Sequence, residues 1–275
     1  MGLNNFWKNF NKLQLIAGHR GFRAIRAENT ISAFLAAYNH CDLIELDVTF
    51  SKDGVPLVIH DDTLTRTTNA YSHKKFTKPY RVSDYSYEEL LELDASSWFA
   101  KSDPFNTIEC GFADTRELTK WNPQRIPTLQ EVLELCKLLK LPVNVELKDH
   151  SKSPVNAVAT LKVVKIIKDL KMEHMVLLSS FNHNYLKEAK ELAPKIETAA
   201  LQEGKHIENP SEYLAALGTN NYNISAELAD KESMRKLLQA GINVGVYTVN
   251  SPIEKIKIFK MGAKVIYTDF LEAEL

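Results

Sequence analysis

The sequence predicts an α/β fold, a TIM (β/α)8 barrel with an insertion after the second strand and its hairpin. Eight short apolar runs rich in β-branched residues alternate with segments of helical periodicity along most of the 275 residues. Barrels of this kind commonly take about 250 residues, so the chain is long enough for one such domain. An open, doubly wound sheet produces the same alternation and remains the structural alternative.

The eight expected strands are short and nearly continuous in apolar residues, which is typical of parallel strands buried on both faces. In chain order they are Leu15–Gly18, Leu43–Val48, Pro142–Leu147, Met175–Ser179, Ile196–Leu201, Tyr222–Ser225, Ile242–Val249 and Val265–Thr268.

The expected helices lie between these strands, and several carry start or stop signals. Pro154 and Pro252 each follow a serine, as at a helix start, and Gly218, Gly241 and Gly262 stand where helices end. In chain order the helices are Asn29–His40, Thr128–Lys140, Pro154–Lys171, Asn182–Leu192, Pro210–Leu217, Asp230–Ala240 and Pro252–Met261.

One apolar run, Pro56–His60, follows the second strand too closely for a helical crossover, which needs a dozen or more residues. The dipeptide Asp53-Gly54 before it is a strong hairpin signal. A two-residue turn there would place Asp47 opposite His60. The hairpin would then rise above the barrel and return His60 to the level of Asp47, which keeps the barrel at eight strands.

The segment from about residue 62 to residue 125 has little of the barrel's periodicity. So long an excursion is typical of a functional insertion or a small subdomain. We expect Trp98, Phe99 and Trp121 to form the small core of this subdomain, although a wall that receives a lipid chain is the alternative. No linker divides the chain, so residues 1–275 are expected to form one barrel domain that carries this insertion.

Composition and charge restrict the partners. The chain has 34 Lys and Arg against 35 Asp and Glu, which excludes a broad basic surface for nucleic acid or an anionic membrane. Cys41, Cys110 and Cys136 cannot all pair, so we expect free thiols in a reducing compartment. No apolar run has the ~18–20 residues of a membrane-spanning helix. A cytoplasmic protein with a small-molecule partner is expected, and no feature predicts an oligomeric state.

Acidic residues gather where the expected strands end, which is where barrel active sites form. Glu45 and Asp47 are two apart on one strand, so both face the barrel interior. Glu146 joins them if the valines of its own strand face outward. Three convergent carboxylates suit one hard divalent cation, Mg²⁺ or Ca²⁺. Pairing of these acids with Arg20 and Lys148 in a structural network is the alternative.

Histidine and basic residues follow the same strand ends. Histidine is the side chain whose ordinary pKa lies near neutrality, so His19 and His60 are candidates for a paired general base and general acid. Arg20 offers a forked donor and Lys148 a point charge, which together suit the oxygens of a phosphate. The combination points to phosphoryl chemistry rather than to glycoside hydrolysis.

Short motifs, many of which contain these residues, follow one another over residues 16–269, which is nearly the whole chain. They are Gly18-His19-Arg20-Gly21, Glu28-Asn29-Thr30, Glu45-Leu46-Asp47, Lys52-Asp53-Gly54, His60-Asp61, Glu146-Leu147-Lys148, Ser180-Phe181, Thr248-Val249-Asn250 and Thr268-Asp269. This ordered set resembles the glycerophosphodiester phosphodiesterase family.

The resemblance implies a metal-dependent hydrolysis of glycerophosphodiesters to glycerol 3-phosphate and an alcohol. It implies that the glycerol 2-hydroxyl attacks phosphorus with help from one histidine, while the other histidine protonates the leaving alcohol, and that water then opens the cyclic phosphate. By position it implies the metal ligands Glu45, Asp47 and Glu146, the catalytic pair His19 and His60, and the phosphate contacts Arg20 and Lys148.

The chain departs from the family's pattern at two places. Ala27 replaces the usual proline before Glu-Asn-Thr, which we expect the loop to tolerate. Tyr247 stands where the family commonly has Trp, at a position that faces the glycerol, so we expect it to bind substrate. Lysophospholipase D or phosphatidylinositol phospholipase C-like action on a lipid phosphodiester is the alternative. A silent binding barrel is disfavoured because none of the implied catalytic side chains is missing.

Overall fold

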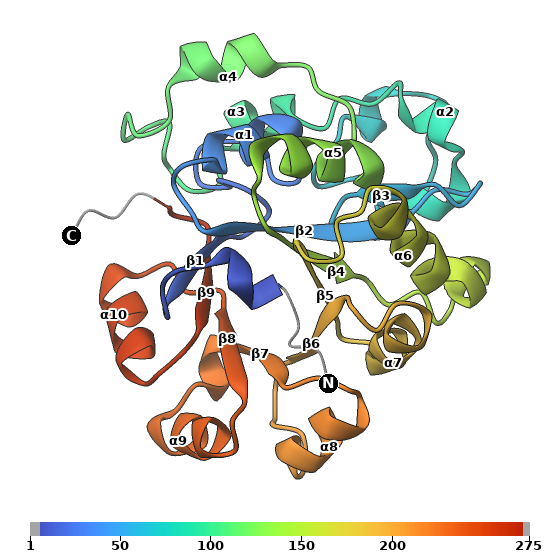
Figure 1. Cartoon of the computed structure of the whole chain (residues 1–275). Coiled ribbons are helices and arrows are strands. Elements are labelled where there is room, and N and C mark those ends of the chain that lie inside the picture. Colours follow the sequence, from blue (N-terminus) through green and yellow to red (C-terminus); the bar gives the residue numbers. More distant parts are fainter. Residues whose placement is uncertain (1–5, 272–275) are drawn as a thin grey trace.

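The computed structural model describes residues 6–271, which form a closed barrel of parallel strands with helices around it (Figure 1). The predicted TIM barrel is confirmed, and the open sheet is wrong because β1 pairs with both β9 and β2. In spatial order the barrel strands are β1 (Leu15–Gly18), β2 (Leu43–Phe50), β4 (Val143–Leu147), β5 (Val176–Ser180), β6 (Glu197–Gln202), β7 (Asn221–Ser225), β8 (Asn243–Tyr247) and β9 (Val265–Thr268).

Each expected helix is present, with ends that differ by a few residues. The helices around the barrel are α1 (Ile31–Ala37), α5 (Leu129–Leu139), α6 (Ala159–Asp169), α7 (His183–Leu192), α8 (Pro210–Ala216), α9 (Lys231–Gln239) and α10 (Pro252–Lys260). Side-chain caps start several of them, as Thr128 does by accepting from the backbone of Glu131. The expected helix at Pro154 begins as a 3-10 turn, η4 (Pro154–Val158), before α6.

Side chains alternate along each strand between the outer face of the barrel and its interior, and each face has its own apolar core. Outward residues such as Ile44 and Val145 pack with the apolar faces of α5 and α6. Inward residues low in the barrel, such as Leu15 and Leu43, pack around Phe6 from the short helix η1 (Phe6–Asn9). Figure 1 shows this first helix lying across the middle of the ring of strands. The barrel is therefore closed at its amino end, and a site can open only at the carboxyl ends of the strands.

The hairpin after β2 differs from its prediction by one residue. β3 (Pro56–Val58) is antiparallel to β2, and Val58 lies opposite Val48. The loop has three residues rather than two because Gly54 adopts a left-handed conformation with φ of 75°. The backbone N–H of Ile59 donates to the carbonyl of Asp47 at 3.1 Å, so Ile59 and not His60 lies opposite Asp47.

The segment between β3 and α5 holds short helices around two small apolar clusters. These are η2 (Ala70–Ser72), η3 (Val82–Asp84), α2 (Tyr87–Leu90), α3 (Ser97–Ser102) and α4 (Thr115–Trp121). Phe99 is buried and Trp98 packs beside it, but Trp121 is 37% exposed, so its predicted place in this core is wrong. The two ends of the segment meet, because the N–H of Val58 donates to the carbonyl of Pro127 at 2.8 Å. Among residues 6–271, no helix is long and apolar enough to cross a membrane.

Candidate active site

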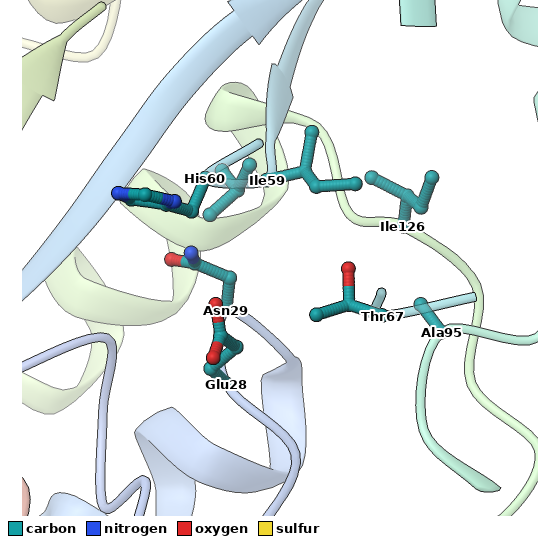
Figure 2. Close-up of a pocket in the computed structure, with 8 residues that line it drawn as sticks. Glu28, Asn29, Ile59, His60, Thr67, Ala95 and Ile126 are labelled. Carbon is teal, nitrogen blue, oxygen red and sulfur yellow. The ribbon is translucent and has the colours of Figure 1, made fainter. Parts of the chain in front are cut away.

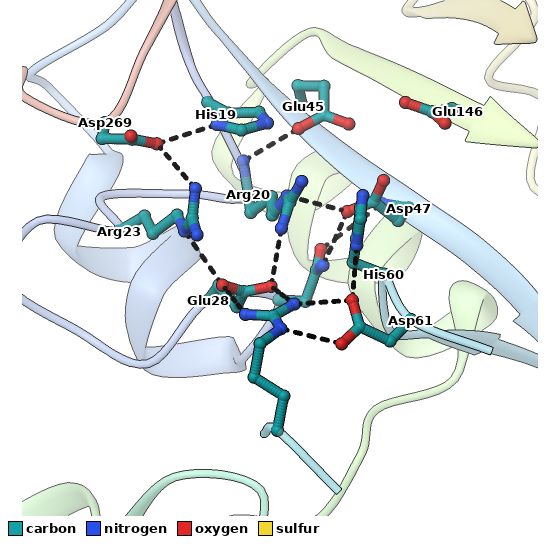
Figure 3. Close-up of polar contacts among 12 residues, drawn as sticks. His19, Arg20, Arg23, Glu28, Glu45, Asp47, His60, Asp61, Glu146 and Asp269 are labelled. Carbon is teal, nitrogen blue, oxygen red and sulfur yellow. Dashed lines mark hydrogen bonds and ion pairs between the residues drawn. The ribbon is translucent and has the colours of Figure 1, made fainter. Parts of the chain in front are cut away.

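Three carboxylates converge at the carboxyl ends of β2 and β4 (Figure 3). Glu45, Asp47 and Glu146 each offer one oxygen, and these oxygens lie within 4.8 Å of one another. Register produces this meeting, because Asp47 is paired with Glu146 across the two parallel strands. Glu45 and Asp47 are buried, with Glu45 only 4% exposed. The structure thus brings together the three side chains that the sequence singled out as metal ligands.

Asp47 is the member of this acidic cluster that has cationic partners on two sides. Its Oδ2 lies 3.2 Å from Nε of Arg20, and its Oδ1 lies 3.3 Å from Nζ of Lys148. Asn29 also donates from Nδ2 to Oδ2 at 2.8 Å. Burial opposes ionisation of Asp47, but Arg20 and Lys148 outweigh it and hold the pKa of the carboxyl below its usual range. Asp47 is therefore ionised at neutral pH.

Glu45 and Glu146 are in the opposite situation. Burial and the neighbouring Asp47 raise the pKa of both carboxyls above the ordinary value, that of Glu45 by more. Lys148 lies 2.6 Å from Oε1 of Glu146. The pKa of Lys148 is raised to about 12, because Asp47 and Glu146 outweigh the effect of burial.

The donor set fits a hard divalent cation. The predicted alternative, pairing with Arg20 and Lys148, accounts for Asp47 and Glu146, but Glu45 has no ion pair within residues 6–271. Glu45 instead accepts the backbone N–H of Arg20 at 2.9 Å and lines a small open pocket with His19 and Glu146. A buried carboxylate without a cationic partner, beside two others and open to a cavity, is suited to coordinate a metal ion.

Both predicted histidines are held by a carboxylate. Nδ1 of His19 lies 2.8 Å from Oδ1 of Asp269, and Nδ1 of His60 lies 2.6 Å from Oδ1 of Asp61. When each Nδ1–H donates to its carboxylate, the lone pair of Nε2 is left to act as a base. Burial is the largest influence on His19 and lowers its pKa below the ordinary value. Figure 3 shows His19 near Glu45, and His60 beside Asp47.

Asp61 and Asp269 are functional candidates that the sequence interpretation passed over. Both stand inside quoted motifs, His60-Asp61 and Thr268-Asp269, so their neighbours in the sequence were the available signal. Asn250 fixes Asp269 further, by donating from Nδ2 to Oδ2 at 2.8 Å.

The arginine before Gly21 occupies a strained turn that the glycine makes possible. Arg20 has φ of 57° and Gly21 has φ of 85°. The turn aims the Arg20 guanidinium at both Asp47 and Glu28, whose Oε1 it contacts at 2.8 Å. A β-carbon on Gly21 would lie 2.7 Å from the backbone of Ala33, closer than atoms tolerate.

Gly21→Ala is therefore expected to destabilise the protein by about 3 kcal/mol, from a left-handed backbone and a steric clash together. Gly111→Ala is the matched control, because Gly111 also has positive φ but meets nothing within 4 Å. That control should lose about 1 kcal/mol in urea unfolding. Equal losses for the two variants would contradict the steric argument.

Glu28 lies outside the acidic cluster and is surrounded by arginines. It contacts Arg20, Arg23 and Arg66 at 2.7 to 2.9 Å. Figure 2 shows a small cavity between Glu28, His60 and the insertion, where the buried hydroxyl of Thr67 has no partner within residues 6–271.

Tyr247, at the end of β8, lines the same cavity as Glu45 and His19. Its hydroxyl donates to the carbonyl of Gln202 at 2.8 Å, and its ring meets Phe181 edge-on with centroids 6.2 Å apart. The hydroxyl of Tyr247 is thus hydrogen-bonded within the protein, which leaves its ring as the part available to line the pocket.

The barrel and the groups at its mouth define a class of protein. An acidic cluster suited to a cation, two histidines with carboxylate partners and a fixed arginine are the groups expected of a barrel enzyme that hydrolyses phosphoric diesters.

Comparisons with known proteins agree with this class. The model of the Glycerophosphoryl diester phosphodiesterase family matches residues 19–273. A glycerophosphodiester phosphodiesterase from Bacillus altitudinis is 35% identical over 93% of this chain and 94% of its own. One from Caldanaerobacter subterraneus is 33% identical over 93% of each chain. A phosphodiesterase from Oleispira antarctica, solved with the product sn-glycerol-3-phosphate, is 25% identical, with a TM-score of 0.79 and 94% of each chain covered.

The chain belongs to the glycerophosphoryl diester phosphodiesterase family. It is an enzyme, a phosphoric diester hydrolase with glycerophosphodiester phosphodiesterase activity.

Proposed function

We propose that this enzyme uses one divalent cation, Mg²⁺ or Ca²⁺, to hydrolyse glycerophosphodiesters to glycerol 3-phosphate and an alcohol by histidine acid–base catalysis. The observation that carries the proposal is the cluster of Glu45, Asp47 and Glu146, whose ligand oxygens lie within 4.8 Å of one another beside His19 and His60. The Oleispira antarctica enzyme, which binds sn-glycerol-3-phosphate, supports the choice of product.

The three carboxylates would hold the cation, which when bound supplies positive charge to the phosphoryl oxygens. Arg20 and Lys148 border the same place, since each contacts Asp47, and we assign them to the phosphate. Tyr247 would place its ring against the glycerol moiety, because it lines the cavity that His19 and Glu45 share.

His19 and His60 would move the protons. In the first step one histidine accepts the proton of the glycerol 2-hydroxyl as its oxygen attacks phosphorus. The bond from phosphorus to the alcohol breaks, and the other histidine donates a proton to the leaving oxygen. In the second step the roles reverse, and water opens the cyclic phosphate. Asp269 and Asp61 orient the two rings through Nδ1.

The direct test is an assay of glycerol 3-phosphate release from glycerophosphocholine and glycerophosphoethanolamine with Mg²⁺ or Ca²⁺. We expect release that EDTA abolishes and the cation restores. Absence of release with both substrates and both cations would contradict the proposed function. Full activity after exhaustive chelation would contradict only the metal requirement.

Action on a lipid phosphodiester, in the manner of a lysophospholipase D, is the second candidate. Phe181 beside Tyr247 is 39% exposed at the mouth, which is an apolar surface that an acyl chain could meet. Comparison of kcat/KM for glycerophosphocholine and for monomeric lysophosphatidylcholine separates the two candidates.

The acidic cluster predicts that cation affinity rises with pH. The pKa values of Glu45 and Glu146 are raised in the folded protein without a cation, so it binds more protons than the unfolded chain. Below the ordinary Glu pKa of 4.5 these two groups contribute fully to the free energy of unfolding. That contribution is lost as the pH rises from 4.5 through their raised pKa values in the folded protein. A cation must displace these protons.

Calorimetric titration with Ca²⁺ should therefore show tighter binding at pH 8 than at pH 5, with proton release. The melting temperature in EDTA should fall more steeply with rising pH than the melting temperature in Ca²⁺. An affinity independent of pH would contradict this account of the cluster.

The cellular location that we propose is the cytoplasm. Cys41, Cys110 and Cys136 are free thiols, as a reducing compartment favours.

A further inference from the structure

The carboxylate of Glu28 has all of its hydrogen-bonding positions occupied. Oε1 accepts from Nη1 of Arg20 at 2.8 Å and from Nη2 of Arg66 at 2.7 Å. Oε2 accepts from Nε of Arg23 at 2.9 Å and from Nη1 of Arg66 at 2.8 Å. The Glu28 side chain is 1% exposed. Three guanidinium groups so close together would repel one another without this shared anion.

Two of these arginines lead onward to the two histidines (Figure 3). Arg23 reaches Oδ1 of Asp269 at 3.3 Å, and Asp269 holds His19. Arg66 reaches Asp61 with two contacts of 2.7 and 2.8 Å, and Asp61 holds His60. The two chains of contacts have the Glu28 carboxylate in common. His19 follows β1, whereas His60 follows β3 at the start of the insertion.

We propose that Glu28 is a positioning residue shared by both histidine–carboxylate pairs, which it aligns through Arg23 and Arg66. The inference rests on the proposed acid–base function of His19 and His60. Its physical basis is that a guanidinium held on one side by Glu28 presents its remaining N–H groups to Asp61 or Asp269 in one fixed orientation.

Glu28→Gln tests this role. The amide keeps the shape of the side chain but offers one acceptor oxygen, and its NH₂ would face guanidinium donors. Both imidazoles would then lose their fixed placement. We expect kcat to fall on the order of 10²-fold, as misplacement by about 1 Å can cause. KM and the Ca²⁺ dissociation constant should each change by less than about threefold, because Arg20 and Lys148, which we assign to the phosphate, both keep their contacts with Asp47.

Glu131→Gln is the matched control, since Glu131 also pairs with an arginine, Arg125, but at the start of α5, where both side chains are partly exposed. It should keep wild-type kcat. If Glu28→Gln does not fold, the double variant Arg23→Gln/Arg66→Gln replaces it and should show the same loss of kcat with unchanged Ca²⁺ affinity.

A kcat within about threefold of wild type in the folded variant would overturn the positioning role and leave the proposed function intact. A fall in Ca²⁺ affinity as large as the fall in kcat would also overturn it, because the effect would then act through the cation. Failure of the wild-type enzyme to release glycerol 3-phosphate would instead count against the proposed function itself.

Discussion

Glu45→Gln is expected to remove Ca²⁺ binding and to lower kcat on the order of 10³-fold. The substitution takes away the one member of the acidic cluster that has no cationic partner within residues 6–271. The remaining carboxylates, Asp47 and Glu146, both contact Lys148, which then neutralises part of their charge. Calorimetric titration with Ca²⁺ and release of glycerol 3-phosphate measure the two effects.

The same variant should be no less stable than wild type in EDTA, because it loses a buried carboxyl that neighbouring acids repel. Ca²⁺ at 100 times its dissociation constant should stabilise wild type by about 2.7 kcal/mol and the variant by nothing. Glu197→Gln is the matched control, since Glu197 is similarly buried but belongs to no acidic cluster in the part of the chain that the structure describes. Retention of wild-type Ca²⁺ affinity by Glu45→Gln would show that the ligand assignment is wrong.

His19→Asn and His60→Asn are each expected to lower kcat by about 10²- to 10⁴-fold while Ca²⁺ still binds. Each substitution removes a proton-transfer group but none of the carboxylates. His206→Asn is the control, because His206 contacts the backbone of Leu228 away from the cluster. If either histidine variant keeps wild-type kcat, that histidine is not catalytic.

A substrate with a better leaving group separates the acid from the base. Glycerophospho-p-nitrophenol expels a phenolate that needs little protonation, so the variant that lacks the general acid should recover most of its rate on this substrate. The variant that lacks the general base should not. Equal recovery by both variants would contradict the division of roles between His19 and His60.

The barrel and its acidic cluster could be predicted because both follow from the alternation of residues within each strand and from the way a parallel barrel aligns the strand ends. Alternation along a strand places Glu45 and Asp47 on one face, and the parallel register of β2 and β4 then sets Glu146 beside them. The helix starts were readable for the same reason, since a cap such as Thr128 and its partner Glu131 lie within one turn.

The charged contacts behind the histidines could not be predicted, because no periodic pattern records them. His19 and Asp269 are separated by 250 positions, and Glu28 and Arg66 by 38. The hairpin register failed for a different reason. Asp53-Gly54 favours a two-residue turn, but the left-handed Gly54 closes a three-residue loop and shifts every pair by one position.

The insertion begins and ends at one point on the barrel, because Leu57 bridges Thr128 and Val58 bonds Pro127. The free energy of closing a chain between two neighbouring anchor points depends weakly on the length of the chain, since each doubling of that length costs roughly 0.6 kcal/mol. The length of the segment between Thr68 and Pro123 is therefore weakly constrained by chain closure, whereas Phe99 and Thr107 within it are constrained by their buried contacts with Ala27 and Ala24. We expect changes of length in this segment to alter the mouth of the barrel while the acidic cluster on β2 and β4 stays in place.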